Sequence, residues 1–518
     1  MIKPFRILLF LISVLLLLLS IAWFSPSKGY RIGNFSLRYP NFQSIQTKLI
    51  GNFHVKKDTL RVPQKTNVIA KLDSLPIKNE EIDSLSTLKQ IENDTLIDSE
   101  SITEITPELL KAKITPIEFA DSNQNALDYF FKSLANKKTT SEKIHVLHFG
   151  DSQIEGDRVT MFIRAALQSE FGGNGVGIVP GYPQSYQPLN ILHSASSDWR
   201  YTSLFDGSDE VNQYGLLGGI TEIENGSEGE KIEFKKIRKN NYSNQFRQLR
   251  IFYGKNDSTY VMELGVNGNT FDAEILAKAN NITEHVFKVP TTANDIELEF
   301  TGKGPFSVYG VSLESEHGIY VDNIPQRGNS GTAFTKFNAD FSKKIFNLLN
   351  VKCVILQYGV NVVPGNLSSY KYYEEILYRQ IKAIKSFKPD VSIILIGVSD
   401  MSHKVDDKFE SYSNIEKVRD AQRNAAFRAG AAFWDCYKAM GGKNSMPQWV
   451  YADPPLATKD FTHFNYRGSK LIGEMLVAAL MEEYSKFIDS NQKKDINEAT
   501  ISMENAKTQS SKAANGKE

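Results

Sequence analysis

Short apolar runs alternate with amphipathic segments over much of the chain, and this pattern predicts the fold class. The run KIHVLHF (143–149) precedes apolar residues at helical spacing as far as Phe171, where a Gly-Gly pair ends the segment. The runs VKCVILQY, VSIILIG and AAFWDCY each follow a helix-like segment, and a last helix is expected across GSKLIGEMLVAALMEEY. Continuously apolar strands that alternate with helices are typical of a parallel sheet with helices on both faces. We therefore predict an α/β fold whose site lies beyond the carboxyl ends of the strands.

A different pattern fills residues 185–315, where apolar and polar residues alternate one by one. The segments RQLRIFYG, TYVMELGVNGN, TEHVFKVP, NDIELEFTG and FSVYGVSLES are separated by turn signals such as Asn267-Gly268. This pattern predicts a β-sandwich inserted into the α/β domain, whose two parts would span 119–184 and 316–488. Either the sandwich binds a sugar, with Trp199 and Tyr201 as candidate stacking residues, or it is a structural wall of the cleft.

The N-terminus is long and apolar enough to enter a membrane. The segment Ile7–Phe24 is interrupted only by Ser13 and Ser20 and follows two basic residues, and no small-x-small cleavage site comes after it. We predict an uncleaved signal anchor within residues 1–30, a single transmembrane helix, with a removed signal peptide as the alternative. In both interpretations, the rest of the chain is exported across the membrane.

Two polar segments flank the predicted domains. From His54 to Glu118 there is no Phe, Tyr or Trp, although aromatic residues make up 11% of the chain. Such a segment buries too little apolar surface to offset its ordering entropy, so we predict a juxtamembrane segment and disordered linker over 31–118. Sixty flexible residues would span roughly 40 Å. Residues 489–518 are equally polar, and we expect a loose tail from about Asn491.

Charge and cysteine content exclude several classes of function. Sixty basic and sixty acidic residues cancel, so no positive field favours nucleic acid as a partner. Cys353 and Cys436 each lie inside an apolar strand-like run and are predicted to be buried free thiols. No metal site or nucleotide-binding loop of useful specificity is present, so we expect no cofactor.

The stretch LHFGDSQIEGDRV (147–159) places a serine where the first strand gives way to a helix. Ser152 would lie at the carboxyl edge of the sheet, near a positive helix end that favours a developing oxyanion. Gly-Asp-Ser also suits a tight turn in which the aspartate only forms hydrogen bonds. Ser152 is therefore a candidate nucleophile if the chain supplies a base.

A candidate base lies just before the last predicted helix, in KDFTHFNYRG. Asp460 precedes His463 by three residues, a spacing at which a carboxylate can hold one ring nitrogen while the other faces the serine. His403 is a rival base, because it follows another strand and has Asp400 three residues before it. His148 falls within the first strand and is expected in the core.

Two further loops offer donors for an oxyanion. The loop after VKCVILQY reads GVN and puts the side-chain amide of Asn361 at a strand end. A second loop, PQRGNSGTAF, contains Gly331, where the backbone could approach a substrate closely. Each loop could be an ordinary turn, but the four motifs in this order are much less probable by chance than any one of them.

These four motifs resemble the blocks of the SGNH or GDSL hydrolases. The resemblance rests on FGDS at Ser152, RGNSGT at Gly331, YGVN at Asn361 and DFTH at Asp460 and His463, and covers about Lys143 to Tyr484 apart from the insert. It implies a flavodoxin-like α/β/α sandwich. It also implies that Ser152 is the nucleophile, His463 the base and then the acid, and Asp460 the residue that orients it. The implied oxyanion hole combines the backbone N–H groups of Ser152 and Gly331 with the Asn361 side chain.

Two longer segments narrow the resemblance to bacterial cell-wall O-acetylesterases. GVSLESEHGIYVDNIPQRGNSG and FWDCYKAMGGKNSMPQW look like segments of those enzymes, which also carry a β-sandwich between the serine and glycine blocks. One departure is the continuation Gln153-Ile154-Glu155-Gly156 after the serine, in place of the commoner small or histidine-containing residues. This departure leaves the choice of glycan open.

The resemblance implies a serine esterase that removes O-acetyl groups from an exported or cell-wall polysaccharide such as peptidoglycan. An O-acetyltransferase acting on the same class of glycan is a second hypothesis, and a non-catalytic glycan-binding protein is a third. With the predicted anchor, the expected location is the bacterial inner membrane with the catalytic domain in the periplasm. A soluble periplasmic or secreted protein is the alternative.

Overall fold

The chain divides by its internal contacts into two units, Met1–Ser86 and Thr87–Glu518. The computed structural model describes residues 30–32, 35–37, 114–137, 142–184, 191–204, 213–237 and 245–515. In the first unit they form one hairpin, β1 (Tyr30–Ile32) and β2 (Phe35–Leu37). The anchor predicted at Ile7–Phe24 and most of the predicted linker lie outside the described residues. Among the residues that are described, no helix has the length and apolar character needed to cross a bilayer.

A six-stranded sheet forms the centre of the α/β domain, in the spatial order β16-β4-β17-β18-β21-β3. Its strands in chain order are β3 (Ile117–Glu118), β4 (Lys143–Gly150), β16 (Gly318–Pro325), β17 (Val351–Gln357), β18 (Ser392–Ile396) and β21 (Ala432–Trp434). All neighbours pair in parallel except β3, which is antiparallel to β21. The five parallel strands follow the order 2-1-3-4-5 of flavodoxin-like folds. The predicted α/β fold is therefore confirmed.

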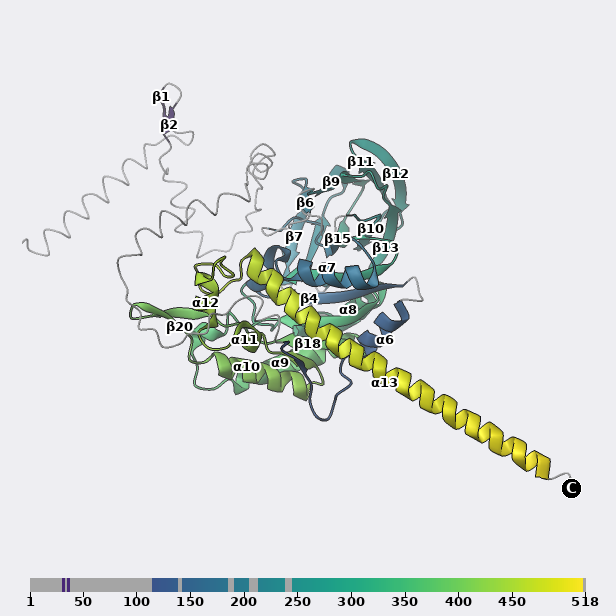
Figure 1. The fold of residues 1–518 in the computed structure, drawn as a ribbon. Coiled ribbons are helices and arrows are strands. Elements are labelled where there is room, and N and C mark those ends of the chain that lie inside the picture. Colours follow the sequence, from purple (N-terminus) through teal and green to yellow (C-terminus); the bar gives the residue numbers. More distant parts are fainter. Residues whose placement is uncertain are drawn as a thin grey trace, which may run out of the picture. The chain divides into compact units, whose positions relative to one another are not determined.

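Helices cover both faces of this sheet because its strands are apolar on both sides (Figure 1). On β4, Leu147 and Phe149 belong to one core cluster, whereas Ile144 and Val146 belong to the other. The first cluster is closed by α8 (Ala339–Leu348), α9 (Lys371–Phe387) and α10 (Ile415–Arg428). The second is closed by α6 (Asp128–Lys137), α7 (Thr160–Phe171) and α13 (Tyr466–Asn515). The shorter helical elements are η1 (Ser152–Asp157), η3 (Phe334–Lys336), η4 (Val363–Gly365), α11 (Cys436–Met440) and α12 (Ser445–Tyr451).

The α/β domain begins earlier than predicted, and its last helix continues beyond the predicted end of the domain. Ile117 is buried in β3, and the carbonyl of Thr115 accepts the indole N–H of Trp434, so the domain begins before residue 119. A two-residue strand is too short to stand out as an apolar run. At the other end, α13 continues to Asn515, so the expectation of a loose tail was wrong for the backbone. Residues 491–515 contain neither Pro nor Gly, which allows the helix to continue.

The segment between α7 and β16 forms two antiparallel sheets around a separate core, which is the arrangement of a β-sandwich. One sheet contains β5 (Gly177–Val179), β7 (Arg200–Ser203), β8 (Gly219–Ile223), β10 (Gln248–Gly254), β13 (Thr283–Lys288) and β15 (Phe306–Glu314). The other contains β6 (Ile191–Ala195), β9 (Ser227–Lys236), β11 (Tyr260–Val266), β12 (Asn269–Leu276) and β14 (Asp295–Gly302). Because β5 pairs with β15, the sandwich begins before the expected residue 185.

Trp199 is part of the sandwich core and not a sugar platform. Its side chain is buried, its indole N–H donates to the carbonyl of Lys231, and its ring meets Phe300 edge to face. The suggestion that Trp199 stacks on a saccharide was therefore wrong, because this residue, which lies just before β7, belongs to the apolar core of the sandwich. Tyr201, two residues later, is only partly buried.

A buried cluster of charged side chains joins the sandwich to the α/β domain. Glu314 at the end of β15 accepts from Lys143 at 2.6 Å and lies 3.4 Å from His145, both on β4. The other nitrogen of the His145 ring lies 2.7 Å from Asp322 of β16, and Arg250 of β10 reaches Glu314 at 3.8 Å. Removing one partner of a buried charge pair is strongly destabilising, so each domain here supplies partners that the charges of the other domain need.

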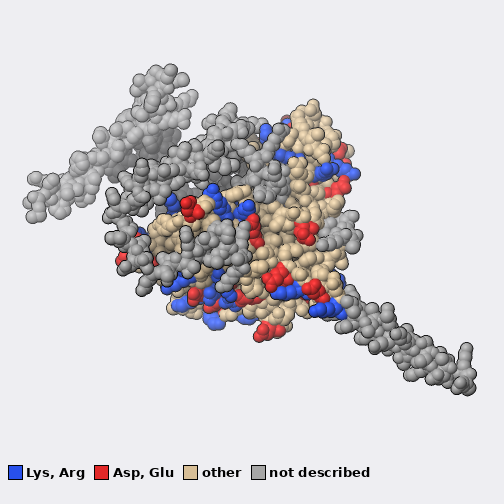
Figure 2. Space-filling view, viewed as in Figure 1, with Lys and Arg blue, Asp and Glu red and all other residues tan. Residues whose placement is uncertain are grey.

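The two cysteines agree with the sequence-based expectation, and one face of the molecule shows how its charged residues are distributed. Cys353 and Cys436 are free thiols with fully buried side chains, as predicted. Figure 2 shows Lys and Arg intermingled with Asp and Glu on the described part of the visible face. That face therefore presents no extended area of one sign.

Candidate active site

The candidate nucleophile lies at the carboxyl end of β4, at the first residue of η1. Asp151 caps this short 3-10 helix by accepting the N–H of Gln153 at 3.0 Å. As the first residue of the helix, Ser152 has an N–H group without a partner from a preceding turn. The structure therefore places the Ser152 hydroxyl and N–H where the first strand meets the helical layer, as the sequence predicts.

The side chains of Ser152, His463 and Asp460 form a continuous hydrogen-bonded chain. The Ser152 Oγ lies 2.7 Å from Nε2 of His463, and Nδ1 of the same ring lies 2.7 Å from Oδ2 of Asp460. Asp460 and His463 lie on the loop between α12 and α13, far from Ser152 along the chain. This is the geometry of a serine activated by an oriented imidazole.

Asp460 remains ionised because of the donors around it. Burial alone would raise the pKa of this carboxyl, but hydrogen bonds from His463, Thr458 and Thr462 hold the pKa well below its usual range. Its Oδ1 accepts the Thr458 hydroxyl at 2.6 Å and the N–H groups of Thr462 and His463 at 3.0 Å each. The carboxylate is thus fixed by its own loop while Oδ2 faces the imidazole.

The rival base occupies a different environment. His403 lies on β19 (Ser402–Val405), which pairs with β20 (Lys408–Ser411), and its ring contacts that of Tyr412 in a tilted arrangement with centroids 4.1 Å apart. Asp400 accepts the hydroxyl of Ser411 and the N–H of Met446, each at 2.7 Å. Asp400 therefore anchors the hairpin to α12, and the structure pairs Ser152 with His463 instead of His403. His148 is buried in the sheet, as predicted.

Asp151 joins the serine loop to the loop that carries Asn361. Its Oδ2 accepts the N–H of Gly359 at 3.0 Å, while Oδ1 caps η1. Burial raises the pKa of Asp151 to about 6, although the backbone donors oppose this shift. The Gly-Asp-Ser motif thus supplies a structural tie as well as a hydroxyl, and this tie fixes the strand ends of β4 and β17 beside each other.

Two of the predicted oxyanion donors, the Gly331 N–H and the Asn361 amide, both donate to Asn329. Gly331 adopts φ +78°, and its N–H donates to the side-chain oxygen of Asn329 at 2.7 Å. The Asn361 amide donates to the Asn329 carbonyl at 3.0 Å and retains a second N–H. The structure therefore does not present the Gly331 N–H toward a substrate. Asn329 is a residue that the sequence analysis missed, although an Asn two residues before a Gly is a signal for an Asx turn.

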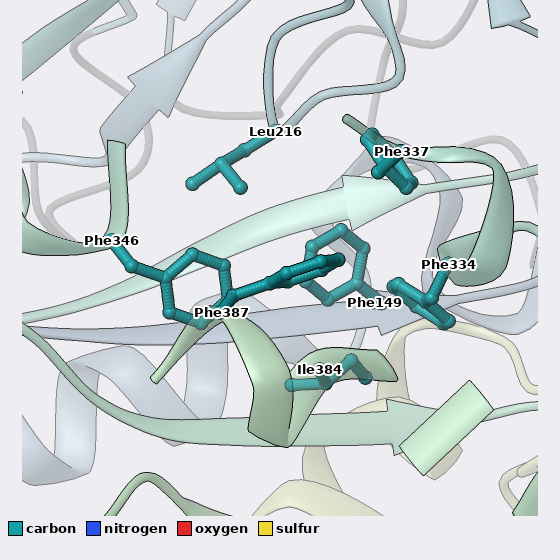
Figure 3. Close-up of a pocket in the computed structure, with 7 residues that line it drawn as sticks. All are labelled: Phe149, Leu216, Phe334, Phe337, Phe346, Ile384 and Phe387. Atoms are coloured by element: carbon teal, nitrogen blue, oxygen red, sulfur yellow. The ribbon is translucent and has the colours of Figure 1, made fainter. Parts of the chain in front are cut away.

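A hollow in the core of the α/β domain is lined by apolar side chains. Figure 3 shows its lining side chains converging from β4, η3, α8 and α9, with Leu216 from the inserted segment. The lining residues are Phe149, Leu216, Phe334, Phe337, Phe346, Ile384 and Phe387. Without a polar group, such a hollow cannot orient an ester, so the chemistry belongs to the Ser152 site. Among the described residues, no cluster of His, Cys, Asp and Glu has the make-up of a metal site.

Comparison with solved structures identifies the fold. A structure described as a peptidoglycan O-acetylesterase in action superposes with a TM-score of 0.55 at 23% identity, over 69% of this chain and 96% of that one. A salicylyl-acyltransferase from a tetracycline biosynthetic pathway gives a TM-score of 0.27 at 12% identity, over 59% and 96% of the two chains. A family two carbohydrate esterase from Clostridium thermocellum gives 0.24 at 10% identity, over 55% and 99%.

The first similarity shows that this chain shares the fold of that peptidoglycan O-acetylesterase over nearly the whole length of that chain. The other two TM-scores are too low to bear on the fold. No family model matches the chain, and no curated protein does.

Proposed function

We propose that this chain is an SGNH-type serine hydrolase that removes O-acetyl groups from an exported or cell-wall polysaccharide. The observation that carries the proposal is the hydrogen-bonded chain Ser152–His463–Asp460, with 2.7 Å at both links. The order of the four sequence motifs and the fold shared with a peptidoglycan O-acetylesterase support the choice of an acetylated glycan.

In the acylation step, the Ser152 Oγ attacks the carbonyl carbon of the acetyl group and its proton passes to Nε2 of His463. Asp460 holds the Nδ1–H and stabilises the imidazolium that results. The tetrahedral oxyanion is stabilised by the N–H of Ser152 and by the N–H of Asn361 that does not bind Asn329. Gly331 contributes a third donor only if Asn329 releases its N–H, so we assign the first two donors the main role.

When the intermediate collapses, the bond between the acetyl carbon and the sugar oxygen breaks. The imidazolium of His463 donates its proton to the departing sugar alkoxide, which leaves Ser152 acetylated. A water molecule then gives a proton to His463, attacks the acetyl carbon, and releases acetate as Ser152 regains its hydrogen. No other reactant is needed.

Exposure of the triad favours hydrolysis over transfer to a second sugar. The His463 side chain is 25% exposed and that of Asp460 is 50% exposed, so water has access to the acyl group. An acetyltransferase gains from excluding water from its acyl-enzyme. We therefore place O-acetyl transfer second. We also propose that the predicted N-terminal anchor holds the enzyme at the inner membrane with its catalytic domain in the periplasm.

The nucleophile is tested with the full-length chain and 4-nitrophenyl acetate. The wild type should release 4-nitrophenol, and Ser152→Ala should reduce kcat at least about 1000-fold while the melting temperature stays unchanged. In His463→Ala, kcat should fall by a similar factor, and in His403→Ala it should stay within about twofold of the wild-type value. Full activity in Ser152→Ala would refute the proposed nucleophile.

The substrate class is tested by acetate release from natural polymers. Purified O-acetylated peptidoglycan and other acetylated exported polysaccharides are compared, each with Ser152→Ala as the blank. Transfer is measured in the same reaction by adding an unacetylated glycan and analysing it for new acetyl groups. A Ser152-dependent acetylated product that exceeds free acetate would favour the acetyltransferase.

A further inference from the structure

Gln153, the residue that follows the candidate nucleophile, reaches the loop of the candidate base. Its amide nitrogen donates to the carbonyl of Thr462 at 2.7 Å, and its amide oxygen accepts the N–H of Phe464 at 3.4 Å. The two partners are the residues directly before and after His463. The same nitrogen also donates to the hydroxyl of Ser399, in the loop after β18 (Ser392–Ile396), at 3.2 Å.

The contacts of Gln153 differ from those of an ordinary buried glutamine, because they flank one residue on both sides. Gln153 is only 2% exposed, so its amide must find protein partners. Ser152 holds the His463 ring and Gln153 holds the backbone that carries the ring, and the two are consecutive residues of one 3-10 turn. One short segment thus fixes both the position of the base and that of the nucleophile.

The histidine loop has other supports, one within the loop and others from β19 and from the serine segment. Within the loop, the N–H of Thr458 donates to the carbonyl of His463, and from β19 the N–H of Ser402 donates to that of Phe461. A second link from the serine segment, Arg158 to the carbonyl of Phe464, is 3.5 Å long. Gln153 makes the shorter connection, so its loss should loosen the loop relative to Ser152.

We propose that Gln153 is a positioning residue that sets the distance between the Ser152 hydroxyl and the His463 imidazole. This inference rests on the proposed esterase function and deepens it. Gln153 does not touch the reacting atoms. A misplacement of the base by about 1 Å can cost about 100-fold in rate, so removal of the amide should act on kcat while the substrate site is left intact.

The test compares Gln153→Met with Gln168→Met in the full-length chain. Gln168 is a matched control, because it is also buried and donates to two carbonyls, those of Gly175 and Ile319, away from the triad. With 4-nitrophenyl acetate, Gln153→Met should lower kcat about 10- to 100-fold and change KM less than about threefold. Labelling of Ser152 by a fluorophosphonate should slow by a similar factor. Gln168→Met should keep both rates within about twofold, whatever its melting temperature.

A spectroscopic measurement separates misplacement from unfolding. The proton between Nδ1 of His463 and Oδ2 of Asp460 should give a low-field resonance in the wild type, and this resonance should persist in Gln153→Met because both residues belong to one loop. If Gln153→Met does not fold, Gln153→Asn serves as the second variant, since its shorter amide cannot bridge Thr462 and Phe464.

The outcomes distinguish the two proposals. If the wild-type activity is absent or survives Ser152→Ala, the proposed function fails. If the activity depends on Ser152 and a folded Gln153→Met or Gln153→Asn keeps wild-type kcat and labelling rate, only the role of Gln153 is overturned. A loss of kcat equal to that of Gln168→Met at equal loss of melting temperature would also overturn it.

Discussion

Asp460 uses its two carboxylate oxygens for different purposes. Oδ1 accepts three donors from its own loop, and Oδ2 is left to face the imidazole. A carboxylate with so many donors has little freedom to turn away. Orientation of His463 is therefore built into the loop before any substrate arrives.

We expect Asp460→Asn to lower kcat about 100-fold or more, because an amide at this position favours the wrong tautomer of the imidazole. Because the pKa of Asp460 is held below its usual range, the carboxylate stays charged across the working pH. The defect should therefore persist at every pH between about 5 and 9. Steady-state rates at several pH values check this, and recovery of Asp460→Asn in acid would contradict it.

The three triad residues were predictable from the sequence, but their supports were not. Ser152, Asp460 and His463 carry short local signals, and the order of the motifs brings them together. The occupation of the Gly331 N–H by Asn329 depends on how one turn closes, and the reach of Gln153 depends on a loop more than three hundred positions away. Such long-range side-chain contacts leave no periodic trace in the sequence.

At the scale of elements, the hairpin of β19 and β20 supports the catalytic loop from outside. The ring of Phe409 stacks on Phe461 with centroids 3.6 Å apart, and the N–H of Ser402 donates to the Phe461 carbonyl. Phe461 adopts φ +54°, a conformation that is rare for a bulky residue and needs its surroundings to hold it. The hairpin supplies that support one residue after Asp460.

We expect Phe409→Ala to lower the free energy of unfolding by about 1–2 kcal/mol, since a stacked aromatic pair and a half-buried ring are lost. It should also lower kcat several-fold, because Phe461 is then free to leave its strained conformation. Phe271→Ala is the control: Phe271 is 51% exposed on β12, and its loss should change stability by less than about 0.5 kcal/mol. Equal effects of the two substitutions on kcat would contradict this role of the hairpin.

The elements themselves were predictable where their period was clear. Strands of the sheet read as continuous apolar runs because both faces are buried, and strands of the sandwich alternate because one face meets water. The two-residue strand β3 and the kink at Glu155 and Gly156 within η1 lacked such a period. These details depend on tertiary contacts.

At the scale of the molecule, the charged cluster between the two domains makes stability depend on pH. Burial alone would lower the pKa of His145, but Asp322 and Glu314 outweigh this effect and raise the pKa to about 9. At pH values below 6.5, the ordinary pKa of histidine, the imidazolium of His145 therefore stabilises the folded state. That contribution is lost as the pH rises from about 6.5 through 9.

We expect the free energy of unfolding to fall by up to about 3 kcal/mol between pH 6.5 and pH 9.5 as His145 loses its proton. His145→Gln should be less stable at pH 6.5 and should show a flatter dependence over this range. His193→Gln is a control, because burial lowers the pKa of His193 to about 4 and leaves it neutral throughout. Urea titrations at the two pH values measure the effect, and an unchanged slope in His145→Gln would refute it.

The pairing of β5 with β15 has a consequence for how the chain can fold. The first two strands of the parallel sheet, β4 and β16, are neighbours in space but are separated by the whole sandwich. Since the sandwich pairs its own first and last strands, its folding brings these distant ends together and removes most of the loop-closure entropy. The sandwich can thus form first and hold the two ends of its segment close together. Strands β4 and β16 then pair as though the connection between them were short.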